Sequence, residues 1–281
     1  MQSNETLTFK LRKPAVAGMF YPSDAQQLRK EVELLLENAT STHGAGSIGA
    51  VVAPHAGYVY SGYVAAEAYR LILNQSYDTV VVISPSHRDY FSGISLYPGD
   101  YETPLGVVEL DRDMARDLLA AGGPIRASEL GHRQEHGVEV ELPFLQVALG
   151  DFRFVPLVMG TQDEPSSFGL GQILSDVCSR RKVLLVASSD LSHFYPLRAA
   201  NKLDLQVVED VEAYDARRFF EHVKQRRCEA CGYGTIIAAI LGSRGAGCEA
   251  SRVLSYHTSG EISGDYEEVV GYMSAIFYAK A

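Results

Sequence analysis

The sequence contains no tryptophan and only four cysteines in 281 residues. Four cysteines are too few for the disulfide framework of a secreted scaffold at this length. Two of them, Cys228 and Cys231, form a C-x-x-C pair, but a zinc ribbon would need a second such pair. We therefore expect reduced thiols, each free to fill the core, bind a metal or act as a nucleophile.

Long apolar runs and an excess of positive charge are missing as well. No run is long enough to cross a bilayer, and the polar N-terminus MQSNETLTFKLRKP lacks the apolar stretch of a secretory signal. The formal net charge of -10 argues against a general electrostatic attraction to nucleic acid or to an anionic membrane. We therefore expect a cytoplasmic protein that binds neither nucleic acid nor membrane.

Hydrophobic residues make up 46% of the chain, which is ample for one large core. Short β-branched runs predict strands buried on both faces, at 49–53, 79–84, 153–158 and 182–188. Amphipathic stretches predict helices at 24–38, 62–73, 111–121, 165–180, 198–211 and 232–242, and a last strand pair is expected at 252–257 and 266–278.

The alternation of strands and helices predicts the architecture. A capping box of Ser23 and Gln26 is expected to open the helix at 24–38. The chain has no internal repeat, low-complexity tract or linker, so residues 1–281 are interpreted as one domain. We expect a three-layer α/β/α fold with a central, mostly parallel or mixed sheet. Such sheets bind ligands beyond the carboxyl ends of their strands.

Three of the predicted strands lead directly into a histidine: His55, His87 and His193. A single histidine of this kind would most simply be a loop residue that satisfies a backbone group. Because parallel strands bring their ends to the same edge, three equivalent placements among eight histidines predict one shared site instead. Imidazole suits such a site, since it binds transition metals and transfers protons near neutral pH.

Three further positions have open interpretations. Asp190 could orient an imidazole or accept a proton, or it could be the N-cap of the segment that follows. The acidic run at 135–141 could favour a helix N-terminus, or Glu135 or His136 could reach the cleft, to support a ligand or contact a substrate. Cys231 precedes a predicted helix, where a thiol pKa is lowered, although spacing alone favours a small buried residue beside a glycine turn.

The chain resembles the Memo family, called AmmeMemoRadiSam system protein B in prokaryotes, in an ordered set of motifs. The matching segments are AGMFYP at 17–22, APHAGYVYSG at 53–62, SPSH at 84–87, ETPLG at 102–106, EHGVEVELPFL at 135–145, SSDLSH at 188–193 and ACGYG at 230–234. The family is similar in fold to the class III, LigB-type, extradiol dioxygenases, so the resemblance implies a related α/β/α core.

The resemblance also implies roles for individual residues. His55, His87 and Cys231 would form a metal-binding triad, with Fe(II) or Cu as the expected metal and Zn as the alternative. His193, with Asp190 nearby, would occupy the position of the acid/base histidine. His136, Phe20 and Tyr21 would lie around the cleft. The family name implies a functional link to a radical-SAM protein and to a small partner domain.

One departure limits what the resemblance implies. The dioxygenases bind ferrous iron through two histidines and a carboxylate. Here the third candidate ligand is Cys231, a softer donor that can itself be oxidised. Extradiol ring cleavage is therefore not assigned from the resemblance.

Three functions compete. The first is metal-dependent redox chemistry or metal handling, with His193 as the proton-handling group. The second is a non-catalytic module that binds a peptide or protein in the same cleft. The third is hydrolysis, by a metal-bound water activated by His193 or by Cys231 as nucleophile with His193 as base. The second rests on aromatic residues that would line a pocket or else fill the core: Phe20, Tyr21, Tyr58, Tyr60 and Tyr63.

Overall fold

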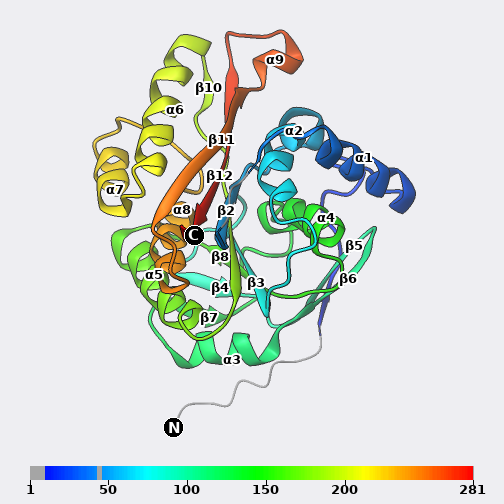
Figure 1. Cartoon of the computed structure of the whole chain (residues 1–281), viewed down its shortest axis with the longest axis vertical. Helices are drawn as coiled ribbons and strands as arrows, with labels where there is room; N and C mark the ends of the chain where they lie inside the picture. The colour runs from blue at the N-terminus through cyan, green and yellow to red at the C-terminus, as the bar shows by residue number, and fades with distance from the viewer. Residues whose placement is uncertain (1–9, 43–45, 281) are drawn as a thin grey trace.

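The fold is built around five parallel strands. The computed structural model describes residues 10–42 and 46–280, so the first nine residues of the predicted domain lie outside the described part. Within it, twelve strands form one sheet, seen nearly edge-on in Figure 1. Its parallel centre runs in the order β6 (Gly106–Leu110), β8 (Arg153–Met159), β3 (Thr79–Pro85), β9 (Val183–Ser188) and β2 (Ile48–Ala53).

Antiparallel strands extend the sheet on both sides, so the predicted mixed sheet is confirmed. Beyond β2 lie β12 (Val269–Tyr278), β11 (Ala250–Thr258) and β10 (His193–Tyr195), all antiparallel to their neighbours. Beyond β6 lie β5 (Asp100–Thr103) and β1 (Leu11–Arg12), while β4 (Ile94–Leu96) and β7 (Ile125–Ala127) extend from β8.

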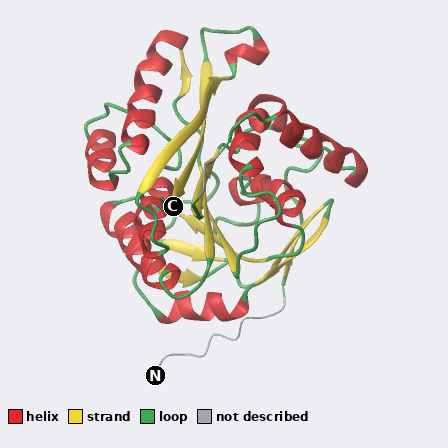
Figure 2. Ribbon diagram, viewed as in Figure 1, coloured by secondary structure: helices red, strands yellow, loops and turns green. Residues whose placement is uncertain are grey.

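Helices cover both faces of the sheet, which confirms the three-layer arrangement (Figure 2). The buried strands alternate between the two faces: Val81 and Ile83 of β3 enter one hydrophobic core, and Val80 and Val82 enter the other. The second core is covered by α1 (Ala25–Asn38), α2 (Tyr58–Arg70) and α4 (Gly137–Leu149). The first is covered by α3 (Arg112–Ala120), α5 (Glu164–Cys178), α6 (Leu197–Glu212), α7 (Ala216–Lys224) and α8 (Tyr233–Gly245), and a short α9 (Gly260–Ser263) joins β11 to β12.

Several element boundaries differ from the sequence predictions. The N-cap of α1 is Asp24, whose carboxylate accepts from the backbone N of Gln27, so Ser23 is not the cap. Helix α2 begins at Tyr58 rather than at residue 62, directly after the loop that carries His55. Helix α7 was not predicted. No helix in the described ranges is both long and apolar enough to span a bilayer.

A buried ion pair ties the N-terminal segment to α4. Arg12 and Glu139 are 4% and 0% exposed, and the Arg12 guanidinium contacts the Glu139 carboxylate. Arg12 also donates from Nε to the carbonyl of His132 at 3.0 Å, and from Nη2 to the carbonyl of Glu135. The Glu139 carboxylate accepts from the backbone N of Ala15 at 2.7 Å. This pair therefore holds the loop at 132–136 as well as the helix.

The buried pair of Arg12 and Glu139 leads to a prediction about the free energy of unfolding. Arg12→Met should destabilise the protein by about 3–5 kcal/mol, because it leaves the Glu139 carboxylate buried without its cation. Arg116→Met is the matched control: Arg116 and its partner Asp113 are each 67% exposed, so the cost should stay below about 1 kcal/mol. Urea unfolding of both variants measures the difference. Equal effects would show that the Arg12 pair does not organise this region.

Candidate metal centre

The sheet order brings the predicted strand-end histidines together. Strands β3, β9 and β2 are parallel neighbours, so their carboxyl ends lie side by side. His55 follows β2 and His87 follows β3, and the centroids of their rings are 5.0 Å apart. His193 begins β10 after β9, and it lies near enough to His55 to contribute to the lowered pKa of that residue. The shared edge was predicted from the sequence.

His136 completes the cluster. The centroid of its ring lies 5.1 Å from that of His55 and 4.7 Å from that of His87. One ligand atom from each of His55, His87 and His136 lies within 4.8 Å of the other two, so the three could hold a metal ion. Nδ1 of His136 is buried, forms no hydrogen bond with the described residues, and lies 3.2 Å from Oε1 of Glu135. A buried imidazole beside two others fits a metal ligand.

Hydrogen bonds around the cluster orient its imidazole rings. The Glu135 carboxylate lies 2.9 Å from Nδ1 of His87, and it also accepts from the backbone N of His87 at 2.6 Å. A carboxylate can only accept, so Nδ1 of His87 carries a proton, and in the neutral ring Nε2 keeps its lone pair. A carboxylate behind a metal-ligating histidine is a common arrangement in metalloproteins.

The electrostatics of the cluster favour neutral imidazoles. Burial lowers the pKa of His55 well below its usual value, and burial together with the charge of His55 lowers the pKa of His136 to about 3. Burial alone would raise the pKa of Glu135, but the hydrogen bond and charge of His87 lower it to about 2. Neutral imidazoles at His55 and His136 are in the protonation state in which histidine binds a transition metal.

Cys231 lies next to His55 but outside the set of three mutually close ligand atoms. Its Sγ is 3.2 Å from Nε2 of His55, and it accepts from the backbone N of Asp190 at 3.2 Å. Gln162 holds the loop by donating to the Cys231 carbonyl at 2.7 Å. The expected lowering of the thiol pKa is wrong: desolvation and the Asp190 carboxylate raise the pKa of Cys231.

The structure also places Asp190 and His193. The Asp190 carboxylate accepts from the backbone N of His55 at 2.8 Å, and the next element is strand β10, so Asp190 is not a helix N-cap. The His193 ring is half-buried and makes no hydrogen bond with the described residues, which leaves its nitrogens available. The nitrogen beside the Cys231 sulfur belongs to His55, which weakens the prediction of a Cys231–His193 nucleophile and base.

The predicted pocket aromatics divide between the histidine cluster and the core. The ring centroid of Phe20 lies 4.9 Å from that of His136, so Phe20 is beside the cluster. Tyr21 and Tyr58 are each 3% exposed and belong to a hydrophobic core, so their placement on the pocket wall is wrong. The Tyr21 hydroxyl donates to Glu139 and the Tyr58 hydroxyl to the carbonyl of Val140, because a buried hydroxyl needs an acceptor.

Sequence comparison identifies the family. The model of the Memo-like protein family matches residues 12–276. The chain belongs to the Memo family. It is 39% identical over 269 residues to a MEMO1 family protein of Methanosarcina barkeri, covering 95% of this chain and 99% of that protein. Identity to the MEMO1 family protein of Methanopyrus kandleri is 37% over 278 residues, covering 95% of this chain and 98% of that protein.

A comparison of folds finds an uncharacterized protein of Escherichia coli K12. Its crystal structure matches with a TM-score of 0.49 and 14% sequence identity, covering 81% of this chain and 99% of that chain.

Sequence reasoning gave too little weight to the glutamates of 135–141. Glu135, Glu139 and Glu141 are 2%, 0% and 0% exposed, and each contacts a residue that builds or supports the cluster. The signal was present, because Glu139 and Glu141 are the charged residues of an otherwise apolar helix, GVEVELPFLQVAL. A carboxylate in such a helix is buried and requires a partner.

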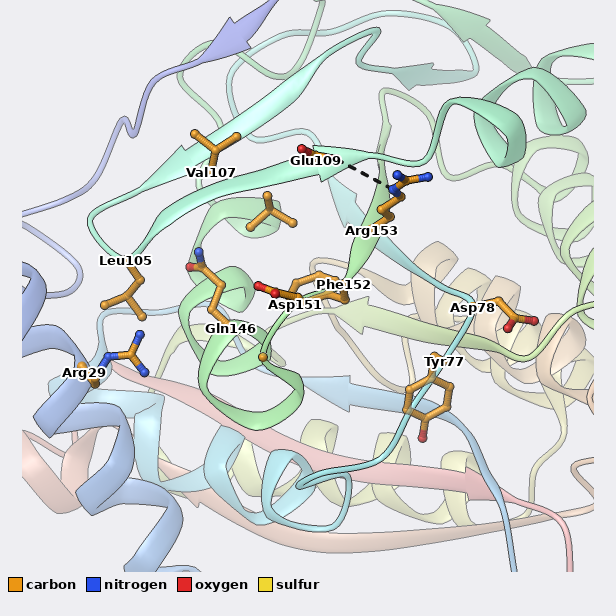
Figure 3. A pocket seen from close by; sticks show the side chains of 12 residues that line it. Arg29, Tyr77, Asp78, Leu105, Val107, Glu109, Gln146, Asp151, Phe152 and Arg153 are labelled. Atoms are coloured by element: carbon orange, nitrogen blue, oxygen red, sulfur yellow. Dashed lines mark ion pairs between the residues drawn. The ribbon is translucent and has the colours of Figure 1, made fainter.

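A separate groove lies at the opposite end of the parallel strands (Figure 3). It has a volume of about 730 Å³ and is lined by segments just before β3 and β8, together with Arg29 of α1 and the β5–β6 hairpin. Among its lining residues, Arg153 and Glu109 lie on the neighbouring strands β8 and β6 and form an exposed ion pair at 3.8 Å. No histidine or cysteine lines this groove, so the imidazole and thiol ligands stay at the carboxyl ends of the strands.

The buried carboxyl group of Asp204, which lies near His193, leads to a prediction about how the stability of the protein depends on pH. Asp204 of α6 is 0% exposed and accepts from the backbone N of Ser192 at 3.0 Å. Burial raises its pKa from 3.8 to about 6. The folded state therefore binds this proton more tightly than the unfolded chain. The resulting stability is fully present below pH 4 and is lost as the pH rises towards 6.

Asp204→Asn should remove this pH dependence. Between pH 4 and pH 7, the stability of the variant relative to the natural protein should rise by up to about 3 kcal/mol. Urea unfolding at both pH values measures it. A difference between the two proteins that does not change with pH would contradict the assignment.

Proposed function

We propose that this protein binds a redox-active transition metal, Fe(II) or Cu, with Zn as the alternative metal. The bound metal would serve either redox chemistry or metal handling. The observation that carries the proposal is the cluster of His55, His87 and His136, whose ligand atoms lie within 4.8 Å of one another. Neutral imidazole is a good ligand for all three metals, so the cluster supports a metal without selecting one.

Cys231 is proposed as a further ligand. Bond lengths of about 2.1 Å to nitrogen and 2.3 Å to sulfur at a tetrahedral centre put the two ligand atoms about 3.5 Å apart. The 3.2 Å between Sγ of Cys231 and Nε2 of His55 is close to this value, so one ion can be shared by both. His55 and His87 would anchor the metal, with Cys231 and His136 completing its coordination.

The chain's own residues supply the rest of the chemistry. A bound metal of this kind contributes electron transfer or Lewis acidity. His193, half-buried and without a hydrogen bond to the described residues, is proposed to hold or move a proton at its free ring nitrogen. Asp190 lies near enough to be influenced by the charge of His193, and it holds the backbone of His55 in place.

Metal content tests the proposal. Protein purified without oxygen should contain iron or copper, and His55→Ala/His87→Ala should lose it, because two of the anchoring ligands are gone. Elemental analysis of both proteins gives the answer, with Ser243→Ala as a control at a buried site away from the cluster. A double variant that keeps the metal content of the natural protein would overturn the proposal.

Cobalt spectroscopy separates the two candidate completing ligands. With Co²⁺ bound, the natural protein should show a sulfur-to-cobalt charge-transfer band, and Cys231→Ala should lose that band while still binding Co²⁺ through the imidazoles. His136→Ala should keep the band and bind Co²⁺ more weakly. A natural protein that binds Co²⁺ without the band would show that Cys231 is not a ligand.

The exposed apolar side chains near the cluster favour a second candidate function, a non-catalytic module that binds a peptide or protein. Met19, Val59 and Phe194 are 72%, 64% and 69% exposed, and all three belong to segments that adjoin the cluster residues. Exposed apolar side chains of this kind suit the binding of a peptide or protein partner. Binding of a partner that survives loss of all the proposed metal ligands would favour this module over a metal-dependent role.

A further inference from the structure

Glu141 is a buried carboxyl group without a basic partner. It is 0% exposed on α4, and no Lys, Arg or His side chain in the described ranges forms an ion pair with it. Its Oε2 accepts from the Tyr69 hydroxyl at 2.7 Å, and its Oε1 lies 2.7 Å from Oγ of Ser188. A carboxyl group is seldom buried in this way without a specific use.

Ser188 links this carboxyl group to His55. It is the last residue of β9 and is fully buried. Its Oγ lies 2.7 Å from Nδ1 of His55 and 2.8 Å from the carbonyl oxygen of Gly137. Together with Glu141, three polar atoms therefore surround one hydroxyl group, and the distances determine which of them carry protons.

The proton count follows from elementary hydrogen-bond chemistry. A hydroxyl group has one proton and two lone pairs. The carbonyl of Gly137 can only accept, so its 2.8 Å contact requires the Ser188 proton. Nδ1 of His55 and Oε1 of Glu141 must then donate protons of their own to Oγ. The pKa of Glu141, which burial raises to about 8, agrees with a protonated acid at neutral pH.

We propose that Ser188, held by the protonated Glu141, is the positioning residue that fixes His55 with its proton on Nδ1. Nε2 then keeps its lone pair, and Nε2 is the atom that faces Cys231 at 3.2 Å. Glu141 matters because its donated hydrogen bond occupies one lone pair of Ser188 and directs the hydroxyl proton to Gly137. The use of this tautomer for metal binding rests on the proposed function.

The arrangement parallels the one behind His87. There an ionised carboxylate, Glu135, accepts directly from Nδ1, whereas behind His55 a neutral acid acts through a serine. Both carboxyl groups belong to the segment 135–141, so one short stretch of chain sets the tautomers of two ligands from different strands. Partners of this kind change metal affinity by about 10- to 100-fold when they are removed.

Histidine tautomers measured by ¹⁵N NMR test the proposal without any metal. In the metal-free natural protein, His55 should carry its proton on Nδ1. Ser188→Ala and Glu141→Leu should give a mixture of both tautomers, whereas Glu141→Gln should keep the Nδ1 form, because an amide can donate to Ser188 and accept from Tyr69. A proton on Nε2 in the natural protein, or an unchanged tautomer in Ser188→Ala, would overturn the proposal.

Co²⁺ affinity gives the second readout. Ser188→Ala and Glu141→Leu should each weaken Co²⁺ binding by about 10- to 100-fold. Glu141→Gln should stay within about twofold of the natural protein, as should Ser243→Ala, which removes another buried hydroxyl. If Glu141→Gln is as damaging as Glu141→Leu, the residue does not act as a proton donor and the proposal is wrong. A natural protein that binds no Co²⁺ would contradict the proposed function, while the tautomers would still decide the role of Ser188.

Discussion

The carboxylate of Glu135 joins the end of a central strand to the start of a buried helix, and the arrangement of the histidine cluster depends on it. It accepts from the backbone and the ring of His87, which follows β3, and from the backbone N of His136 and of Gly137, where α4 begins. The free N–H groups of a helix N-terminus favour such a negative charge. Because one anion binds both segments, it sets the distance between His87 and His136 as well as the tautomer of His87.

Helix α4 supports the cluster along its first two turns. Glu139 is held by Arg12, and the same guanidinium holds the carbonyl of Glu135, so the loop before the helix cannot shift independently of the N-terminal segment. Glu141 reaches the strand end at Ser188. Each carboxyl group costs desolvation free energy on burial, and each recovers it through hydrogen bonds to a different part of the chain. The glutamates of the acidic run therefore connect α4 and the loop before it to distant parts of the chain.

The site combines neutral imidazoles at His55 and His136 with a thiol kept protonated by its surroundings. Burial lowers the pKa of His55 and of His136, and desolvation raises that of Cys231. A bound cation would reverse the balance at the sulfur, since a metal favours the thiolate form. These surroundings make a free nucleophilic thiolate unfavourable at Cys231.

The sequence by itself determined the strands, the mixed α/β/α fold and the edge where His55 and His87 meet, because burial periodicity is local and parallel strands end on one side. It also pointed to Cys231 through family motifs. Only the tertiary structure decided that His136 joins the cluster, that Tyr21 and Tyr58 belong to the core, and that Glu141 contacts Ser188. These outcomes depend on contacts between residues far apart in the chain, such as Arg12 with Glu139 and Ser188 with His55. A local pattern can show that a polar side chain is buried, but the partner that satisfies it is chosen by packing.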